Sequence, residues 1–433
     1  MPGRLVEPQR YWIETLGCPK NQVDSDKLTG TLLADGMTGA DSPESADLVV
    51  VNTCAFIEAA RQESIDTVLA LAGTRKDGAR VVVTGCMAER YGDELARALP
   101  EVDAVSGFGV PVSLGTKPGS ALLREAARPL PLLDLLNLPR PKSERPWAYV
   151  KIAEGCDRNC GFCAIPSFRG PQRSRTFDAI LREVDELDVR EVVLVAQDLA
   201  SYGKDEPQTL GAGSIVKLVD AVAERAERVR LLYLYPSDLS DALIDAILRT
   251  EVPYFDLSLQ HVSKPHLRRM RRWGDGDRFL KRIADIRSRA PEAAFRSNFI
   301  VGYPGETEAD HDLMLRFIED AQLDWCGFFE YSAEEGTYAY DLPGAVAPAL
   351  MRERLAELSE MQDRITARRR DDLVGTEIHV LVDEPGIGRS HREAPEIDGV
   401  VNLRGAAEVG TFVSAQVIAA EGPDLVAEVM VPS

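Results

Sequence analysis

The sequence predicts an α/β protein in three parts: an N-terminal parallel-sheet domain, a central partial barrel of six β/α units, and a small C-terminal β-barrel. Short strands rich in valine and leucine alternate with helical segments in the first hundred residues and again between residues 147 and 370, which is the pattern of parallel sheets. From residue 373 onward the chain carries short β-rich runs separated by glycine and proline. Its 433 residues, 45% of them hydrophobic, are enough for two or three domains.

The N-terminal domain is expected to span residues 8–115. Its strands are expected at 11–16, 47–51 and 80–83, with helical segments between them. Prolines are frequent from residue 111 to residue 146, and proline neither continues a helix nor donates to a sheet ladder. Residues 116–146 are therefore predicted to be a connector over the protein surface.

The central domain is expected to span residues 147–370. Strands are expected at 148–153, 191–196, 229–234, 254–259, 295–301 and 325–331. Helices are expected at 177–187, 215–227, 240–248, 277–290, 308–321 and 350–370. Six consecutive β/α units predict a six-fold parallel barrel, open or partly closed. The last domain, 373–433, has β-rich runs at 377–382, 399–401, 411–419 and 425–431.

Charge and hydropathy restrict the class of protein. Lysine and arginine total 50 against 70 aspartate and glutamate, a formal charge of -20, so a protein that binds nucleic acid by general electrostatic attraction is not expected. The chain has no apolar run of membrane-spanning length and no signal-peptide core near its start, which predicts a cytoplasmic protein without a membrane partner. Thiols stay reduced there, so the seven cysteines are interpreted as metal ligands, catalytic thiols or core residues rather than disulfides.

Three cysteines, Cys156, Cys160 and Cys163, form a C-x3-C-x2-C pattern directly after the first barrel strand. Three thiolates on one loop can bind one face of an iron-sulfur cluster, and a fully cysteinyl cluster needs a fourth. No fourth cysteine follows locally, so one iron would be left for an exogenous ligand. A structural zinc site is the alternative, but it also needs four ligands, and no histidine or cysteine pair is near in sequence.

Three further cysteines, Cys18, Cys54 and Cys86, each follow a predicted strand beside glycine or threonine. In a parallel sheet the loops that carry ligands gather at the carboxyl ends of the strands, so these thiols are predicted to converge on a second cluster with an open iron. Three unrelated buried cysteines are the alternative. Cys326 lies inside a strand and is interpreted as a core residue.

The C-x3-C-x2-C loop, with Phe162 before its last cysteine, at the mouth of a β/α barrel resembles the radical S-adenosylmethionine superfamily. The two cysteine sets together, with the string from Thr15 to Asn21, resemble the methylthiotransferase family over essentially the whole chain, including a terminal TRAM module. The strings that carry the likeness to its ribosomal-protein branch are 164–170, 195–198, 231–236 and 259–261.

This resemblance implies two 4Fe-4S clusters and S-adenosylmethionine as cofactors. Cys156, Cys160 and Cys163 would hold the cluster that cleaves S-adenosylmethionine, and Cys18, Cys54 and Cys86 would hold a second cluster that carries sulfur. The reaction would replace an unactivated C–H bond by a methylthio group, on the β-carbon of an aspartate in small-subunit ribosomal protein S-twelve.

The resemblance also implies the residues that contact the cofactor. They are Phe162, Gln197, Gln260, Ser297, Asn298 and Gly302. Two positions depart from the pattern. Gln197 and Asp198 stand where many radical enzymes have Gly-Gly-Glu, which leaves open the group that holds the cofactor ammonium, and Ser258 replaces a usual proline. A turn that only starts the next helix explains the glycine at 302 nearly as well.

No catalytic residue is assigned outright, but three are candidates. Arg169 and Arg175 follow the cluster loop, and paired charge-assisted hydrogen bonds would let either hold a carboxylate of cofactor or substrate. A solvated or salt-bridged face is the alternative. His261 ends a barrel strand, where an orienting hydrogen bond and proton transfer are equally compatible with its position.

The tail from residue 373 carries three basic and ten acidic residues, a net charge of -7. Such a module would repel RNA and suit a basic ribosomal protein, so S-twelve is the expected partner and nucleic acid is not.

An electron donor such as flavodoxin or ferredoxin and a sulfur donor are expected as well. The alternatives are a transfer-RNA adenosine methylthiotransferase and, outside the enzymes, an electron-transfer iron-sulfur protein.

Overall fold

The computed structural model describes residues 9–110, 112, 134–211 and 213–430. It divides into an N-terminal unit, Met1–Lys142 with Glu154–Cys156 and Ala164–Pro171, and a C-terminal unit, Ser143–Ala153 with Asp157–Cys163 and Gln172–Ser433. Most of the expected connector, residues 116–133, lies outside the described residues, as do residues 8, 113–115 and 431–433 at the expected domain ends. No described helix is both long and apolar enough to cross a membrane.

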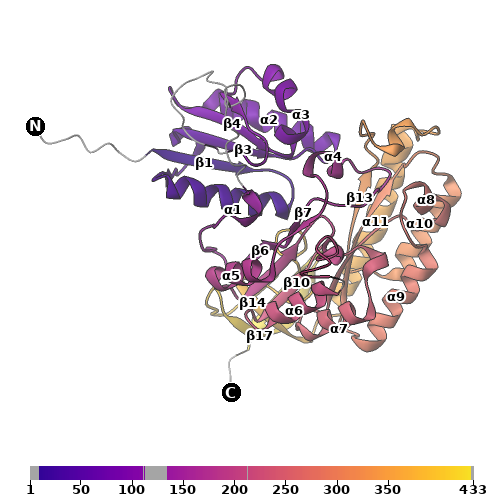
Figure 1. Cartoon of the computed structure of the whole chain (residues 1–433). Helices are drawn as coiled ribbons and strands as arrows, with labels where there is room; N and C mark the ends of the chain where they lie inside the picture. Colours follow the sequence, from indigo (N-terminus) through magenta and orange to yellow (C-terminus); the bar gives the residue numbers. More distant parts are fainter. Residues whose placement is uncertain (1–8, 111, 113–133, 212, 431–433) are drawn as a thin grey trace, which may run out of the picture. The chain divides into compact units, whose positions relative to one another are not determined.

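The N-terminal unit is a five-stranded parallel sheet in the order β2-β1-β3-β4-β5. Its strands are β1 (Arg10–Thr15), β2 (Thr38–Gly39), β3 (Leu48–Thr53), β4 (Arg80–Gly85) and β5 (Ala104–Val105). Helix α1 (Pro19–Ala34) covers one face and helices α2 (Glu58–Thr74) and α3 (Cys86–Ala98) cover the other (Figure 1). Because both faces are covered, every residue of β3 is buried, which explains its continuous apolar run.

The C-terminal unit contains the barrel. Two parallel three-stranded sheets, β10-β9-β6 and β11-β12-β13, are joined by a bridge between Leu234 and Leu257. The predicted partial barrel of six parallel strands is therefore confirmed. The strands are β6 (Trp147–Lys151), β9 (Glu191–Val195), β10 (Arg228–Leu231), β11 (Tyr254–Gln260), β12 (Ala294–Val301) and β13 (Trp325–Glu330).

The predicted barrel helices are also present. They are α5 (Phe177–Leu187), α6 (Ser214–Ala223), α7 (Asp241–Arg249), α9 (Gly276–Arg289), α10 (Glu308–Ala321) and α11 (Pro348–Asp371). Their apolar sides pack on the strands in one continuous core. In the described part of the barrel region, two short strands and two short α-helices were not predicted, because so few residues show no periodicity. They are β7 (Ala153–Glu154), α4 (Ile165–Arg169), β8 (Arg173–Ser174) and α8 (Lys264–Arg269).

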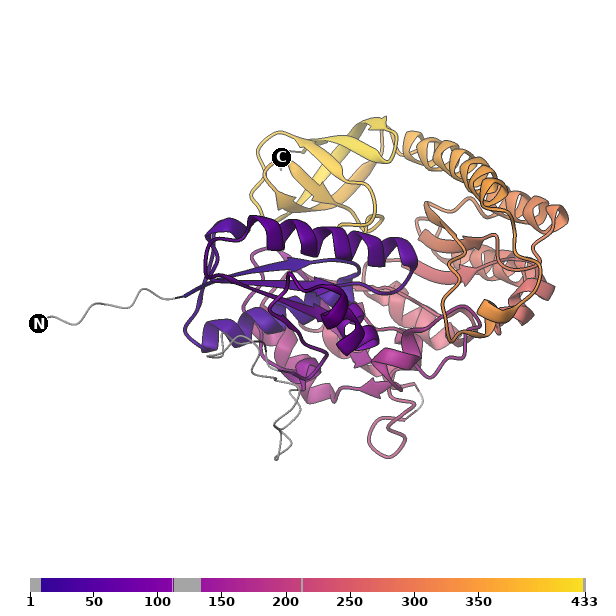
Figure 2. The same ribbon diagram turned by 90° about the horizontal axis from the view of Figure 1, so that it is seen from above.

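The tail forms a closed β-barrel in the order β14-β15-β16-β18-β17, beside the end of α11 (Figure 2). Its strands are β14 (Glu377–Glu384), β15 (Ile387–Arg389), β16 (Val401–Arg404), β17 (Phe412–Glu421) and β18 (Asp424–Val429). Alternate residues of β14, such as Ile378, Val380 and Val382, face a small apolar core. The three-residue strand β15 was not predicted.

The segment from residue 389 to residue 398, which belongs to this C-terminal module, lies against the amino-terminal halves of the barrel strands. Every one of the six strands gives it a polar side chain. These side chains are Tyr149 (to Pro395 O, 2.9 Å), Glu191 (to Arg389, 3.0 Å), Arg230 (to His391 O, 2.9 Å), Tyr254 (to Asp398, 2.6 Å), Arg296 (to Asp398, 2.5 Å) and Trp325 (to Arg392 O, 2.7 Å). The module thus covers this end of the barrel, while the carboxyl ends of the strands lie at the opposite end.

Glu191 is a fully buried charge at this contact. Its side chain is inaccessible to solvent and lies 2.8 Å from Arg230 and 3.0 Å from Arg389. Burial alone would raise the pKa of Glu191, but the positive charges of Arg389 and Arg230 hold that pKa at about 2. The carboxylate therefore stays ionised in the folded protein over the whole neutral and mildly acidic range.

We expect Glu191→Gln to lower the free energy of unfolding by about 3–5 kcal/mol, because Arg230 and Arg389 would stay buried without their counter-charge. Since the folded pKa of Glu191 lies below the unfolded value, its contribution is present above about pH 4.3 and is lost as the pH falls toward 2. Urea unfolding at pH 7 and in steps to acid pH measures both effects.

The control is Glu227→Gln, which removes an exposed ion pair with Arg190 and should cost less than about 1 kcal/mol. Equal stability of the two variants would show that the buried charges at the base of the barrel contribute nothing.

Candidate functional site

The three N-terminal cysteines lie at the carboxyl edge of the parallel sheet. Cys18 precedes α1, Cys54 directly follows β3, and Cys86 begins α3 directly after β4. The thiols influence one another: burial raises the pKa of Cys54 to about 12, and the charges of Cys18 and Cys86 contribute to that increase. The structure thus brings together the three loops that the sequence placed after separate strands.

Gly17 makes the close approach of two of these loops possible. A Cβ atom on Gly17 would lie 2.9 Å from the Cβ and 3.0 Å from the Sγ of Cys54, and the φ of Gly17 is +96°. Asn21 ties the same loops together by donating to Leu16 O at 2.8 Å and to Thr53 O at 3.1 Å. The position of Cys18 next to Cys54 therefore depends on the glycine and on one buried amide.

Arg169, at the end of α4, belongs to this N-terminal site. Its Nε and Nη2 atoms lie 3.4 and 3.1 Å from Cys86 Sγ. The same guanidinium donates to Asn21 Oδ1 at 2.7 Å and to Glu154 at 2.8 Å. Burial would raise the pKa of Cys18, but Lys20 and Arg169 lower it below its usual value. Arg169 was a candidate for holding a substrate or cofactor carboxylate. In the structure its guanidinium instead donates to the sulfur of Cys86.

The barrel cysteines are held by backbone contacts and one arginine. In the N-terminal unit, Cys156 N donates to Gly170 O at 3.1 Å. In the C-terminal unit, Cys163 N donates to Cys160 O at 3.2 Å, and Arg272 Nη1 lies 3.3 Å from Cys160 Sγ. Cys156 is thus held by a backbone contact within its unit, and Cys160 by an arginine within the other.

The two cysteine sets fit iron-sulfur clusters by the chemistry of their donors. All seven cysteines lie in the described residues, and none forms a disulfide. Among the described residues, no group of three or more His, Cys, Asp or Glu side chains is arranged around one metal-ion position. Each set contains a cysteine whose sulfur accepts a hydrogen bond from an arginine, Cys86 from Arg169 and Cys160 from Arg272. Such hydrogen bonds are typical of cluster thiolates.

The expected cofactor residues of the barrel lie at or near its open end. Gln197 follows β9, Gln260 ends β11, and Gly302 follows β12, while Ser297 and Asn298 lie within β12. The Ser297 hydroxyl is buried and donates to Leu257 O at 2.7 Å, so it is engaged within the sheet. The buried Oδ1 of Asn298 has no hydrogen-bond partner among the described residues, which leaves an acceptor for a ligand. Phe162 packs, partly buried, on the barrel core.

Position 302 requires a glycine, because of its backbone conformation and its close neighbours. Its φ is +81°, and a Cβ atom would lie 2.2 Å from Met351 Sδ of α11. Its N–H donates to Glu306 at 2.8 Å, and Arg354 holds the same carboxylate at 2.8 Å. The turn after β12 is thus fixed by a buried ion pair as well as by the glycine.

Asp198, the acid of the Gln197-Asp198 pair, already forms an ion pair with an arginine. Asp198 accepts from Arg158 Nε at 2.5 Å, and Arg158 also pairs with Asp238. The guanidinium groups of Arg158 and Arg272 lie 4.0 and 4.2 Å from the ring centroid of Tyr235. Tyr235 lies in the string 231–236 that carries the family likeness, but no role was expected for it or for the two arginines, because their contacts join residues far apart in the sequence.

The remaining candidates lie inside the C-terminal unit. Arg175 pairs with the buried Glu183 at 2.7 Å and donates to Lys151 O at 2.9 Å. His261 is fully buried, and its Nδ1 accepts from Ser263 N at 2.9 Å. Both side chains are therefore engaged in internal contacts.

Cys326 lies within β13 and packs partly buried on the barrel core. Burial raises the pKa of its thiol far above the usual value, so this cysteine stays protonated. This is the environment expected of a core cysteine.

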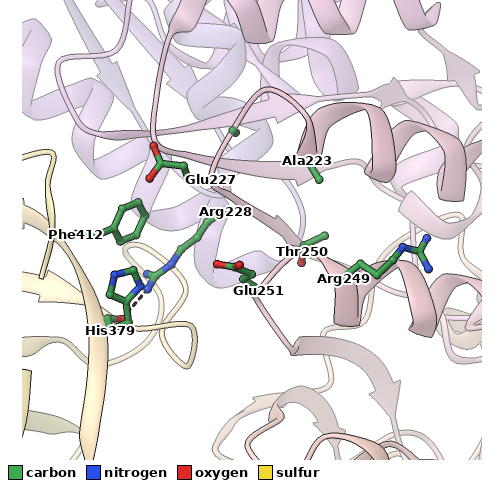
Figure 3. Close-up of a pocket in the computed structure, with 9 residues that line it drawn as sticks. Ala223, Glu227, Arg228, Arg249, Thr250, Glu251, His379 and Phe412 are labelled. Atoms are coloured by element: carbon green, nitrogen blue, oxygen red, sulfur yellow. Dashed lines mark hydrogen bonds between the residues drawn. The ribbon is translucent and has the colours of Figure 1, made fainter. Parts of the chain in front are cut away.

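A cleft of about 260 Å³ lies elsewhere, at the amino end of β10 (Figure 3). Its lining includes Arg228, Glu251, His379 and Phe412. Arg228 points toward two side chains of the C-terminal module, His379 and Phe412, and donates to His379 O at 2.6 Å. None of the expected site residues lines it, so it is separate from the site at the carboxyl ends of the strands.

Comparison with known families agrees with this organisation. Residues 10–107 match the family described as "Uncharacterized protein family UPF0004", residues 150–318 match the radical SAM superfamily, and residues 374–430 match the TRAM domain. A solved structure of the cobalamin-dependent S-adenosylmethionine radical enzyme OxsB is a distant likeness, 11% identical over 83% of this chain and 56% of that chain, with a TM-score of 0.44.

Relatives of similar length share a much higher sequence identity with this chain. The ribosomal protein uS12 methylthiotransferase RimO of Cutibacterium acnes is 42% identical, and the alignment covers 95% of this chain and 96% of the relative. The protein of the same name from Kineococcus radiotolerans is 41% identical over 100% of this chain and 99% of the relative. The chain therefore belongs to the RimO family of radical SAM methylthiotransferases.

Proposed function

We propose that this chain adds a methylthio group to the β-carbon of an aspartate in ribosomal protein uS12, using two 4Fe-4S clusters and S-adenosylmethionine. The observation that carries the proposal is the convergence of Cys18, Cys54 and Cys86 at one edge of a parallel sheet, in a chain that also has the C-x3-C-x2-C loop. An enzyme that only generates a radical needs one such set, whereas an enzyme that also inserts sulfur has a use for a second.

The bound clusters and S-adenosylmethionine supply the radical and sulfur chemistry, which no side chain can perform at an unactivated carbon. The chain's own residues bind and orient these groups. Cys156, Cys160 and Cys163 hold one cluster, and Cys18, Cys54 and Cys86 hold the other.

At the open end of the barrel, the free acceptor of Asn298 and the turn at Gly302 offer contacts to the cofactor, beside Phe162, Gln197 and Gln260. His261 acts as a positioning residue, because its Nε2 lies 3.8 Å from the carboxylate of Glu306, which accepts from Gly302 N. Ser297 and Arg175 act through the internal contacts described above.

The cellular setting follows from the chemistry. We place the protein in the cytoplasm, where ribosomal proteins are made and thiols stay reduced. An electron donor such as flavodoxin or ferredoxin would reduce the clusters, and a separate sulfur donor would replace the sulfur that each turnover consumes.

The C-terminal module presents fewer negative charges than its sequence count suggests. Four of its acids form ion pairs with arginines: Asp383, Glu393, Glu396 and Asp398. Five others are exposed and have no ion-pair partner among the described residues: Glu377, Glu384, Glu408, Glu421 and Glu428. Glu377 and Glu428 both lie opposite Gln416, so they belong to one row across β14, β17 and β18. This row is the proposed contact for a basic ribosomal protein.

We expect about eight irons per chain after anaerobic reconstitution, because each three-cysteine set suits a four-iron cluster. Changing Cys156, Cys160 and Cys163 to alanine should halve the iron and abolish methionine release from S-adenosylmethionine under dithionite. Changing Cys18, Cys54 and Cys86 to alanine should also halve the iron but leave methionine release detectable. Full iron in the second variant would contradict the second cluster.

Mass spectrometry of uS12 and of transfer RNA, each incubated with the reconstituted enzyme, tests the substrate. We expect one aspartate of uS12 to gain a methylthio group in place of hydrogen, because the relatives of matching length carry that activity in their names. The transfer RNA should be unchanged. Modified transfer RNA with unmodified uS12 would favour the nucleic-acid alternative.

Charge removal tests the role of the acidic row together with Glu421, another of the five exposed acids. Changing Glu377, Glu421 and Glu428 together to glutamine should raise the KM for uS12 about tenfold, since each rim charge is worth about 0.5 kcal/mol, and should weaken its dependence on salt. Cofactor cleavage without uS12 should not change. The matched control is Glu319→Gln with Asp320→Asn, two exposed acids on α10. The same KM for both variants would assign the acids to solubility alone.

A further inference from the structure

Arg169 is in an unusual position for an arginine. Only 3% of its side chain is exposed, and two of its nitrogens point at one sulfur, Cys86 Sγ, at 3.1 and 3.4 Å. Burying a guanidinium is costly unless its charge is compensated and its donors are bonded. The surroundings of Arg169 meet both conditions.

The remaining contacts fix the guanidinium in place. Glu154 accepts from it at 2.8 Å, Asp24 lies 3.3 Å away, and Asn21 Oδ1 accepts from it at 2.7 Å. The ring of Phe108 lies 4.5 Å from its central carbon. The carboxylates of Glu154 and Asp24 already occupy two of its sides, so Arg169 is poorly placed to capture a further carboxylate from cofactor or substrate. The donors that remain are directed at the cysteine.

The two carboxylates also compensate the single positive charge of the guanidinium before any ligand is bound. When Cys86 ligates iron as a thiolate, its sulfur gains negative charge within hydrogen-bond distance of Arg169. Hydrogen bonds to cluster sulfur and nearby positive charge both favour the more negative, reduced state of an iron-sulfur cluster.

We propose that Arg169 is a positioning residue of the Cys18, Cys54 and Cys86 site: it orients the Cys86 sulfur and raises the reduction potential of the cluster held there. This inference rests on the proposed function, because it requires that the three cysteines bind a cluster. It assigns to Arg169 a role at the sulfur-carrying cluster, although the residue follows the radical loop in sequence.

The test uses the full chain with Cys156, Cys160 and Cys163 changed to alanine, so that only the N-terminal cluster is present. Its reduction potential is measured by a redox titration followed by electron paramagnetic resonance. Arg169→Gln should shift the potential to a more negative value, because the positive charge is lost. Arg169→Lys should give a smaller shift and an altered spectrum, because lysine keeps the charge but not the planar fork.

Arg140 provides the matched control. It lies in the same unit with its side chain 2% exposed, and it pairs with Asp26 at 2.8 Å. Arg140→Gln should leave the potential and the spectrum unchanged.

The outcomes separate the inference from the function on which it rests. A parent chain that binds no N-terminal cluster overturns the proposed function. A parent that binds the cluster, with an unchanged potential and spectrum in Arg169→Lys and Arg169→Gln, overturns only the role of Arg169. If Arg169→Gln fails to fold, Arg169→Lys decides, and an unchanged potential and spectrum in that variant overturn the proposal.

Discussion

Glu191 lies fully buried between Arg230 of the barrel and Arg389 of the C-terminal module, and this charge cluster joins the two into one unit. Around it, each of the six strands contributes a polar side chain to residues 389–398. Because these contacts cover the amino-terminal ends of the strands, the module leaves uncovered the loops at the carboxyl ends, where parallel β/α barrels carry their sites. The module therefore closes the barrel in addition to presenting an acidic surface.

Strand topology builds the N-terminal cysteine site, whereas the three barrel cysteines lie on one loop between β7 and α4. Parallel strands deliver their loops to one edge, and each cysteine of the N-terminal set lies within three residues of the end of its strand. Glycines with positive φ then allow close approach, as Gly17 does beside Cys54. An arginine donates to one sulfur in each site, although Arg169 and Arg272 lie more than a hundred residues apart. Each site thus has three cysteines and an arginine that donates to one sulfur, although the surrounding folds differ.

Much of this architecture could be predicted from local pattern. Helices α5 and α10 begin and end at the residues that their periodicity indicated, and the six barrel strands follow from their apolar runs. Contacts between distant residues could not be predicted. The three residues of β15 carry no periodic signal, and Asp383, Glu393 and Asp398 count as surface acids in a sequence although arginines from other elements neutralise them. For the same reason the sequence suggested that Arg169 binds a carboxylate of cofactor or substrate, and its contact with Cys86 could not be predicted.

The composition of the N-terminal unit limits how this protein can be taken apart. Besides the first 142 residues, that unit includes Glu154–Cys156 and Ala164–Pro171, and Ala164 and Phe168 belong to its apolar core. A fragment that ended before the barrel would lack these side chains, leaving apolar surface of α3 uncovered and Cys86 without its arginine. Chimeras that exchange this domain between relatives would have to carry the two short barrel segments along with it. The two parts to which the proposed function assigns sulfur transfer and radical generation are therefore interleaved along the chain, and neither could be exchanged alone.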